Sequence, residues 1–147
     1  MKIIVLAGGL STERDVSLSS AAGICRTLVE KGHDAFLLDV FMGLENAPEN
    51  LEDVFTLPDH GLEIVKNIST EEPDLEAVKA SRPDQSDCFF GPNVIELCRL
   101  AAITFLGLHG GEGENGKLQA SFDLLDIKYT GPDSLGCAVA MHKGVAK

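Results

Sequence analysis

The sequence predicts an α/β fold with a doubly wound, mainly parallel sheet of about four strands and an acidic insertion. Short apolar runs alternate with apolar positions spaced every three or four residues, the pattern of strands connected by helices. Glycine-rich loops follow two of the apolar runs, as at the carboxyl edge of a parallel sheet. The 147 residues are 44% hydrophobic. No apolar run approaches the roughly 18 residues that would span a membrane, so we expect one domain with a buried core.

The first third of the chain predicts a βαβ unit. A β-branched, apolar run from Lys2 to Ala7 is the first strand. A helix is expected from about Val16 to Lys31, with Ser17 as a candidate cap and Gly32 as the stop signal. The second strand is expected over residues 34–40, and a right-handed crossover makes the two strands parallel.

The next segment, residues 41–91, predicts an insertion. Residues 44–87 contain 12 acidic and 3 basic side chains, which is most of the net charge of −11. The turn chemistry of residues 58–61, Pro-Asp-His-Gly, predicts a hairpin between Val54–Leu57 and Leu62–Ile68.

The alternating pattern resumes at Pro92. We expect a helix over residues 92–101, a strand at Ile103–Leu108, a helix at Gly116–Leu125 and a short strand at Lys128–Thr130. A last apolar helix starts near residue 134 and reaches the end of the sequence without a stop signal, which predicts a longer parent protein.

Charge and cysteine usage exclude several classes of partner. The net charge of −11 argues against nucleic acid and anionic membranes, and the acidic segment is interpreted as a solvated surface. The four cysteines lack the spacing of metal motifs and no secretory signal precedes them, which indicates reduced thiols in a cytoplasmic protein and no metal site. They are Cys25, Cys88, Cys98 and Cys137.

Two glycine-rich loops carry the residues that could do chemistry. Glu13 lies in the loop of residues 8–14, just before a helix. Such a carboxylate stabilises the helix dipole, or it anchors a ligand cation such as an ammonium group. His109 opens the loop of residues 109–116, which holds four glycines. It is either a structural histidine or a group that hydrogen-bonds a substrate and manages a proton.

The last helix offers a candidate for phosphate binding. Lys143 and Lys147 lie four residues apart. They either stabilise a helix C-terminus or neutralise a phosphate group. Gly8 and Gly9 after the first apolar run do not make a G-x-G-x-x-G fingerprint, and no G-x-x-x-x-G-K-[ST] motif is present, which argues against a dinucleotide fold or a P-loop.

Three motifs in one order resemble those of D-alanine–D-alanine ligases. Residues 8–18, GGLSTERDVSL, resemble the pattern GG-x-S-x-E-x-x-V-S. Residues 108–119 resemble L-H-G-x-x-G-E-D-G-x-x-Q, and residues 129–131 with 141–143 resemble Y-T-G followed by M-D-K. The insertion is similar to that of the longer subclass, which includes D-alanine–D-lactate and D-alanine–D-serine ligases.

The resemblance implies roles for individual residues. Glu13 and His109 would be catalytic: Glu13 would hold the ammonium of the first D-alanine, and His109 would lie beside the same substrate. Val16 would contact the methyl group, Lys143 would contact an ATP phosphate, and no residue of this chain would bind metal. The substrate-binding set is Glu13, Val16, Ser17, His109 and Gly110.

The resemblance also implies what the parent protein does. In this ATP-grasp family ATP phosphorylates one D-alanine, and the amine of a second attacks the acyl phosphate to give a dipeptide for peptidoglycan. Residues 1–131 would be a Rossmann-like substrate-binding domain, and residues 132–147 a helix leading to ATP-grasp domains. The parent would be a cytoplasmic homodimer dependent on ATP and Mg²⁺, whereas this chain alone would be inactive and would bind neither tightly.

Other functions stay open at this point. The second substrate could be D-alanine, D-lactate or D-serine. The chain could instead be a stand-alone amino-acid-binding module, for which micromolar binding of D-alanine by calorimetry would be the evidence. It could also be a structural subunit that docks on a separate ATP-grasp chain, which co-purification would reveal.

Overall fold

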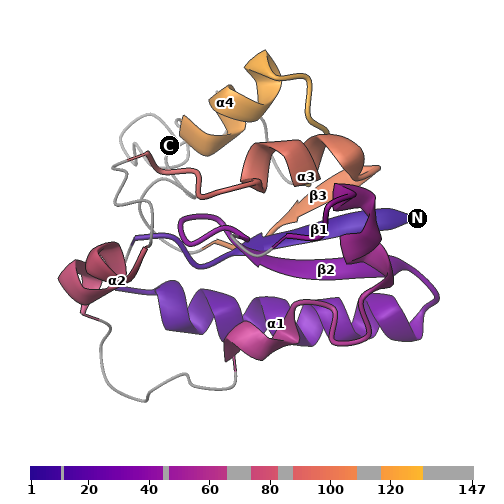
Figure 1. Ribbon diagram of the computed structural model, residues 1–147, viewed down its shortest axis with the longest axis horizontal. Helices are drawn as coiled ribbons and strands as arrows, with labels where there is room; N and C mark the ends of the chain where they lie inside the picture. Colours follow the sequence, from indigo (N-terminus) through magenta and orange to yellow (C-terminus); the bar gives the residue numbers. More distant parts are fainter. Residues whose placement is uncertain (11, 45–46, 66–73, 83–87, 109–116, 131–147) are drawn as a thin grey trace, which may run out of the picture.

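The computed structural model of the chain describes residues 1–10, 12–44, 47–65, 74–82, 88–108 and 117–130. These residues form three strands, four α-helices and two 3₁₀ helices, arranged as in Figure 1. In chain order they are β1 (Lys2–Ala7), α1 (Arg14–Glu30), β2 (Asp34–Asp39), η1 (Leu51–Thr56), η2 (Leu62–Val65), α2 (Leu75–Ser81), α3 (Val94–Leu100), β3 (Ile103–Leu106) and α4 (Lys117–Leu124).

The three strands form one parallel sheet in the order β2-β1-β3, which confirms the α/β class. The expected fourth strand at residues 128–130 is reduced to a single bridge between Thr104 and Tyr129, the only pairing described there. Two hydrogen bonds form this bridge, from the Thr104 N–H to the Lys128 carbonyl at 2.9 Å and from the Thr130 N–H to the Thr104 carbonyl at 3.0 Å.

Helices cover both faces of the sheet (Figure 1). Alternate residues of a strand point to opposite faces. Ile3 and Val5 pack with α1, whereas Ile4 and Leu6 pack with α3 and α4. Because central strand β1 is buried on both faces, its sequence is a continuous apolar run rather than an alternating one.

The end of α1 is as predicted, and its start is not. The helix stops at Glu30, and Gly32 adopts a φ of +91° that lets the chain turn back into β2. The helix begins at Arg14, two residues before the predicted start, and the residue in the N-cap position is Glu13 rather than Ser17. Ser17 lies in the first turn, where its hydroxyl bonds to other loops instead of capping the helix.

The predicted hairpin in the insertion is wrong. Its two arms form the 3₁₀ helices η1 and η2, with residues 66–68 outside the described part of the chain. The consecutive residues Val54 and Phe55 are both buried against the same core, which a strand cannot achieve on one face. The turn between the helices covers the edge of β2, since the Leu37 N–H donates to the His60 carbonyl at 2.8 Å.

The later elements match the sequence expectations closely. Helices α3 and α4 lie within the predicted ranges, and β3 ends two residues early at Leu106. Gly107 follows it, and its N–H still bonds to the Leu6 carbonyl at 2.8 Å. The predicted last helix, with Cys137, lies outside the described residues. Among the residues that are described, no helix is long and apolar enough to cross a membrane.

Candidate functional site

The two glycine-rich loops begin side by side at the carboxyl edge of the sheet. Gly8 and Gly9 follow β1, and Gly107 and Leu108 follow its neighbour β3. A Cβ placed on Gly9 would lie 3.4 Å from the Leu108 side chain. The chain therefore enters the loop of residues 109–116 directly beside the first loop, as expected for a crevice at this edge of a parallel sheet.

Ser17 joins both loops to helix α1. Its side chain is 0% exposed. The hydroxyl donates to the Gly107 carbonyl at 2.7 Å and accepts from the Gly8 N–H at 3.0 Å. This hydroxyl, predicted to bind substrate, thus faces a backbone network under the loops, and a substrate contact for Ser17 stays a prediction.

A buried ion pair lies beside this serine. Arg14 and Asp39 are 7% and 4% exposed, and their Nη2 and Oδ2 atoms are 2.5 Å apart. Arg14 Nη1 also donates to the Gly9 carbonyl at 2.5 Å. Asp39 Oδ1 accepts from three backbone N–H groups, those of Gly9 (3.4 Å), Phe41 (3.0 Å) and Met42 (3.2 Å). Together the two side chains hold both polar groups of Gly9.

Gly8 is required by this arrangement. Its φ is +79°, a conformation that residues with a Cβ rarely adopt. A Cβ there would lie 2.7 Å from Cγ and Oδ1 of Asp39, which is far inside van der Waals contact. The glycine therefore lets the carboxylate approach the loop backbone.

Glu13 and Val16 lie at the exposed rim of the same site. Glu13 is the N-cap residue of α1, and its carbonyl accepts from the Ser17 N–H at 2.9 Å. Its side chain is exposed, and Val16 is 59% exposed. The first turn of α1 thus brings together Glu13, Val16 and Ser17, of which the first two are exposed and the third is buried. His109, Gly110 and Lys143 lie outside the described residues.

Sequence reasoning missed Arg14 and Asp39. Each has an ordinary alternative explanation on its own: Arg14 as a surface residue of a polar loop, and Asp39 as the polar end of a strand. The sequence does contain a signal for the pair. Asp39 ends the buried strand β2, and Arg14 closes the loop that follows the neighbouring strand β1. Because the carboxyl ends of parallel strands lie at one edge of a sheet, these opposite charges are expected to meet there.

Outside this site, the described residues offer neither a metal cluster nor a reactive buried thiol. No group of three His, Cys, Asp or Glu that could hold a metal ion occurs among them. Burial raises the pKa of Cys25 to about 11, and burial raises that of Cys98 to about 12. Both thiols therefore stay protonated and weakly nucleophilic at neutral pH.

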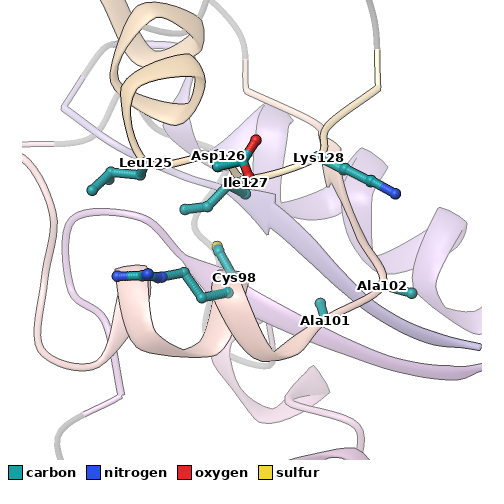
Figure 2. A pocket seen from close by; sticks show the side chains of 8 residues that line it. Cys98, Ala101, Ala102, Leu125, Asp126, Ile127 and Lys128 are labelled. Atoms are coloured by element: carbon teal, nitrogen blue, oxygen red, sulfur yellow. The ribbon is translucent and has the colours of Figure 1, made fainter.

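A cavity of about 380 Å³ lies at the opposite edge of the sheet. It is bounded by the C-terminal ends of α3 and α4, with Cys98, Asp126 and Lys128 among its lining residues (Figure 2). Ala101 and Ala102, which precede β3, also line it. Because these residues mark the amino end of β3, the cavity is separate from the glycine-rich loops.

Comparison with known proteins identifies the family of this domain. The family model described as D-ala D-ala ligase N-terminus matches residues 2–132. The chain is 45% identical over 147 residues to a D-alanine–D-alanine ligase of Lacticaseibacillus casei, covering all of this chain and 41% of that protein. It is 48% identical over 152 residues to a D-alanine–D-alanine ligase of Pediococcus pentosaceus, covering all of this chain and 42% of that protein.

A solved structure shares the fold. The crystal structure of a D-alanine–D-alanine ligase from Bacillus anthracis complexed with ATP superposes with a TM-score of 0.58 at 20% identity. The match covers 99% of this chain and 34% of that one. The chain thus spans about two fifths of the length of the two relatives above and a third of the length of this structure.

Proposed function

Because the chain belongs to the family of D-alanine–D-alanine ligase N-terminal domains, we propose that it holds the first D-alanine of an ATP-dependent ligase. The parent enzyme would join two D-alanines into the dipeptide used for peptidoglycan and the cell wall. It would work in the cytoplasm as a homodimer. Residues 1–131 would be the substrate-binding domain, and residues 132–147 would lead into the ATP-grasp domains.

The observation that carries this proposal is the exposed position of Glu13 at the N-terminus of α1. The backbone of the loop that precedes it is held by the buried side chains of Arg14 and Ser17. An exposed carboxylate can pair with an ammonium group through a charge-assisted hydrogen bond. Val16, one turn further along, is exposed beside it and offers an apolar contact for a methyl group. D-Alanine carries both groups.

The remaining site residues are proposed from the motifs alone. His109 and Gly110 would lie beside the same D-alanine, since their loop starts next to Gly9. Lys143 would contact an ATP phosphate. By resemblance, the Mg²⁺ ligands would belong to the ATP-grasp domains of the parent enzyme, where the metal would stabilise the charge that develops during phosphoryl transfer.

A chimeric ligase tests the proposal. The chain replaces the segment that it matches in the L. casei ligase, and dipeptide formation is measured with ATP, Mg²⁺ and D-alanine. We expect D-alanyl-D-alanine. Glu13→Gln removes the carboxylate, and a charge-assisted hydrogen bond is worth about 1.5–3 kcal/mol. The kcat/KM for the first D-alanine should therefore fall about 10- to 100-fold, whereas KM for ATP should change little.

Asp15→Asn is the matched control, because Asp15 is the other acidic residue in the first turn of α1. If Glu13 only stabilises the helix dipole, the two variants lose similar stability and neither loses activity. A folded chimera that forms no dipeptide contradicts the proposed function, and so does an equal loss of D-alanine and ATP affinity in Glu13→Gln.

A further inference from the structure

The buried pair of Arg14 and Asp39 is not explained by stability alone. Desolvating two charges costs about as much as their attraction returns, so such pairs often contribute little net stability. Two well-packed apolar residues could close the same space. We therefore examine which backbone groups the pair holds in place.

The geometry of the pair fixes the two peptide groups on either side of Gly9. Asp39 Oδ1 accepts from the Gly9 N–H at 3.4 Å, and Arg14 Nη1 donates to the Gly9 carbonyl at 2.5 Å. The second nitrogen of the same guanidinium binds Asp39 Oδ2 at 2.5 Å. A planar guanidinium makes both contacts in one fixed orientation, which a lysine ammonium cannot reproduce.

The same contacts fix the start of helix α1. Arg14 is its first residue, and Glu13 precedes it in the N-cap position. One turn later, Ser17 is tied to the loops after β1 and β3 by two hydrogen bonds. Glu13 thus directly precedes two buried attachment points of the helix, Arg14 and Ser17, while its own side chain is exposed at the rim.

We propose that the Arg14–Asp39 pair positions Glu13 for the ammonium of the first substrate. This inference rests on the proposed function. Arg14 and Asp39 are positioning residues that act through Glu13 and do not touch the substrate. Their effect is to keep the carboxylate in place before the substrate arrives, which reduces the cost of ordering the site on binding.

A double-mutant cycle in the chimeric ligase tests this. Arg14→Lys keeps the charge but loses the forked contact, and we expect kcat/KM for the first D-alanine to fall about tenfold, mainly through KM. In a Glu13→Gln background the same change should cost less than about twofold, because the group that it positions is already lost. Arg26→Lys, on the exposed face of α1, is the matched control and should leave all parameters unchanged.

The outcomes separate this inference from the proposed function. A normal ligase that is insensitive to Glu13→Gln overturns the proposed function. If the ligase is sensitive to Glu13→Gln, three results of Arg14→Lys would overturn the inference. The first is an unchanged kcat/KM for the first D-alanine, and the second is a fold-loss of kcat/KM as large in the Glu13→Gln background as in the parent. The third is a rise in KM for ATP as large as the rise in KM for D-alanine. Hydrogen exchange of the 147-residue chain needs no activity: Arg14→Lys should speed exchange of the Gly9 amide and leave the centre of α1 unchanged. An unchanged Gly9 amide would also overturn the inference.

Discussion

Replacing Ser17 by alanine should weaken the attachment of both glycine-rich loops to helix α1. The serine hydroxyl is 0% exposed and makes two hydrogen bonds, to the Gly8 N–H and to the Gly107 carbonyl. Alanine removes both bonds and leaves a buried N–H and a carbonyl without this partner. The change removes only one oxygen atom, so it creates almost no cavity.

The expected loss follows from these contacts. Two buried hydrogen bonds contribute about 0.5–1.5 kcal/mol each, and leaving one buried polar group unsatisfied costs about 1–3 kcal/mol. Alanine regains about 0.5 kcal/mol through its higher helix propensity. The free energy of unfolding should therefore fall by roughly 1.5–5.5 kcal/mol, which lowers Tm by roughly 5–15 °C in a chain of this size.

Urea unfolding of the 147-residue chain, followed by circular dichroism, measures this change. The control is Ser20→Ala, an exposed serine on the same helix, which should alter stability by less than about 0.5 kcal/mol. A Ser17→Ala variant as stable as the control would refute the reasoning. It would show that the hydroxyl does not hold the loops, and a role in contacting substrate would then be its better explanation.

Two further predictions concern the loop and the buried thiols. Gly8→Ala should destabilise the chain by more than about 2 kcal/mol, because a positive φ and an overlap with the Asp39 carboxylate both oppose a Cβ. Gly23→Ala, where a Cβ meets nothing within 4 Å, should instead stabilise helix α1 by about 0.5–1 kcal/mol. If denaturant unfolding gave the two variants similar changes in the free energy of unfolding, the structure of the loop at Gly8 would be contradicted. Burial raises the pKa of Cys25 to about 11 and that of Cys98 to about 12, so ionisation of the unfolded thiols should lower stability as pH rises above about 8.5. Unfolding free energies at pH 7.5 and 10 should differ less in Cys98→Ala than in the parent chain, and an equal difference would show that this thiol is not protected.

The elements that the sequence predicted correctly are those whose pattern is local. Strand β1 is apolar along its whole length because both of its faces are covered, and α1 stops where Gly32 allows a positive φ. The hairpin at residues 54–68 was predicted from its turn residues, but no local signal shows that Val54 and Phe55 face the same core. Elements whose form depends on packing against distant segments are the ones that the sequence did not predict.

The candidate site divides in the same way. Glu13, His109 and the glycines are predicted site residues because each motif gathers its members within a few positions. Arg14 and Asp39 were missed because they lie 25 positions apart and meet only through the sheet. Ser17 was found, but its hydroxyl bonds to Gly8 and to Gly107, which is 90 positions away. A short motif therefore combines residues predicted to face the substrate with residues that support the loops, and only the fold separates them.

The central claim is that Glu13 binds the ammonium of D-alanine. A crystal structure of the chimeric ligase with D-alanine tests it most directly, through the distance between the Glu13 carboxylate and the substrate nitrogen. We expect about 2.7–3.2 Å, the range of a charge-assisted hydrogen bond, with the Val16 side chain against the methyl group. D-Alanine bound with its nitrogen more than about 5 Å from this carboxylate, well outside that range, would show that Glu13 does not bind the ammonium.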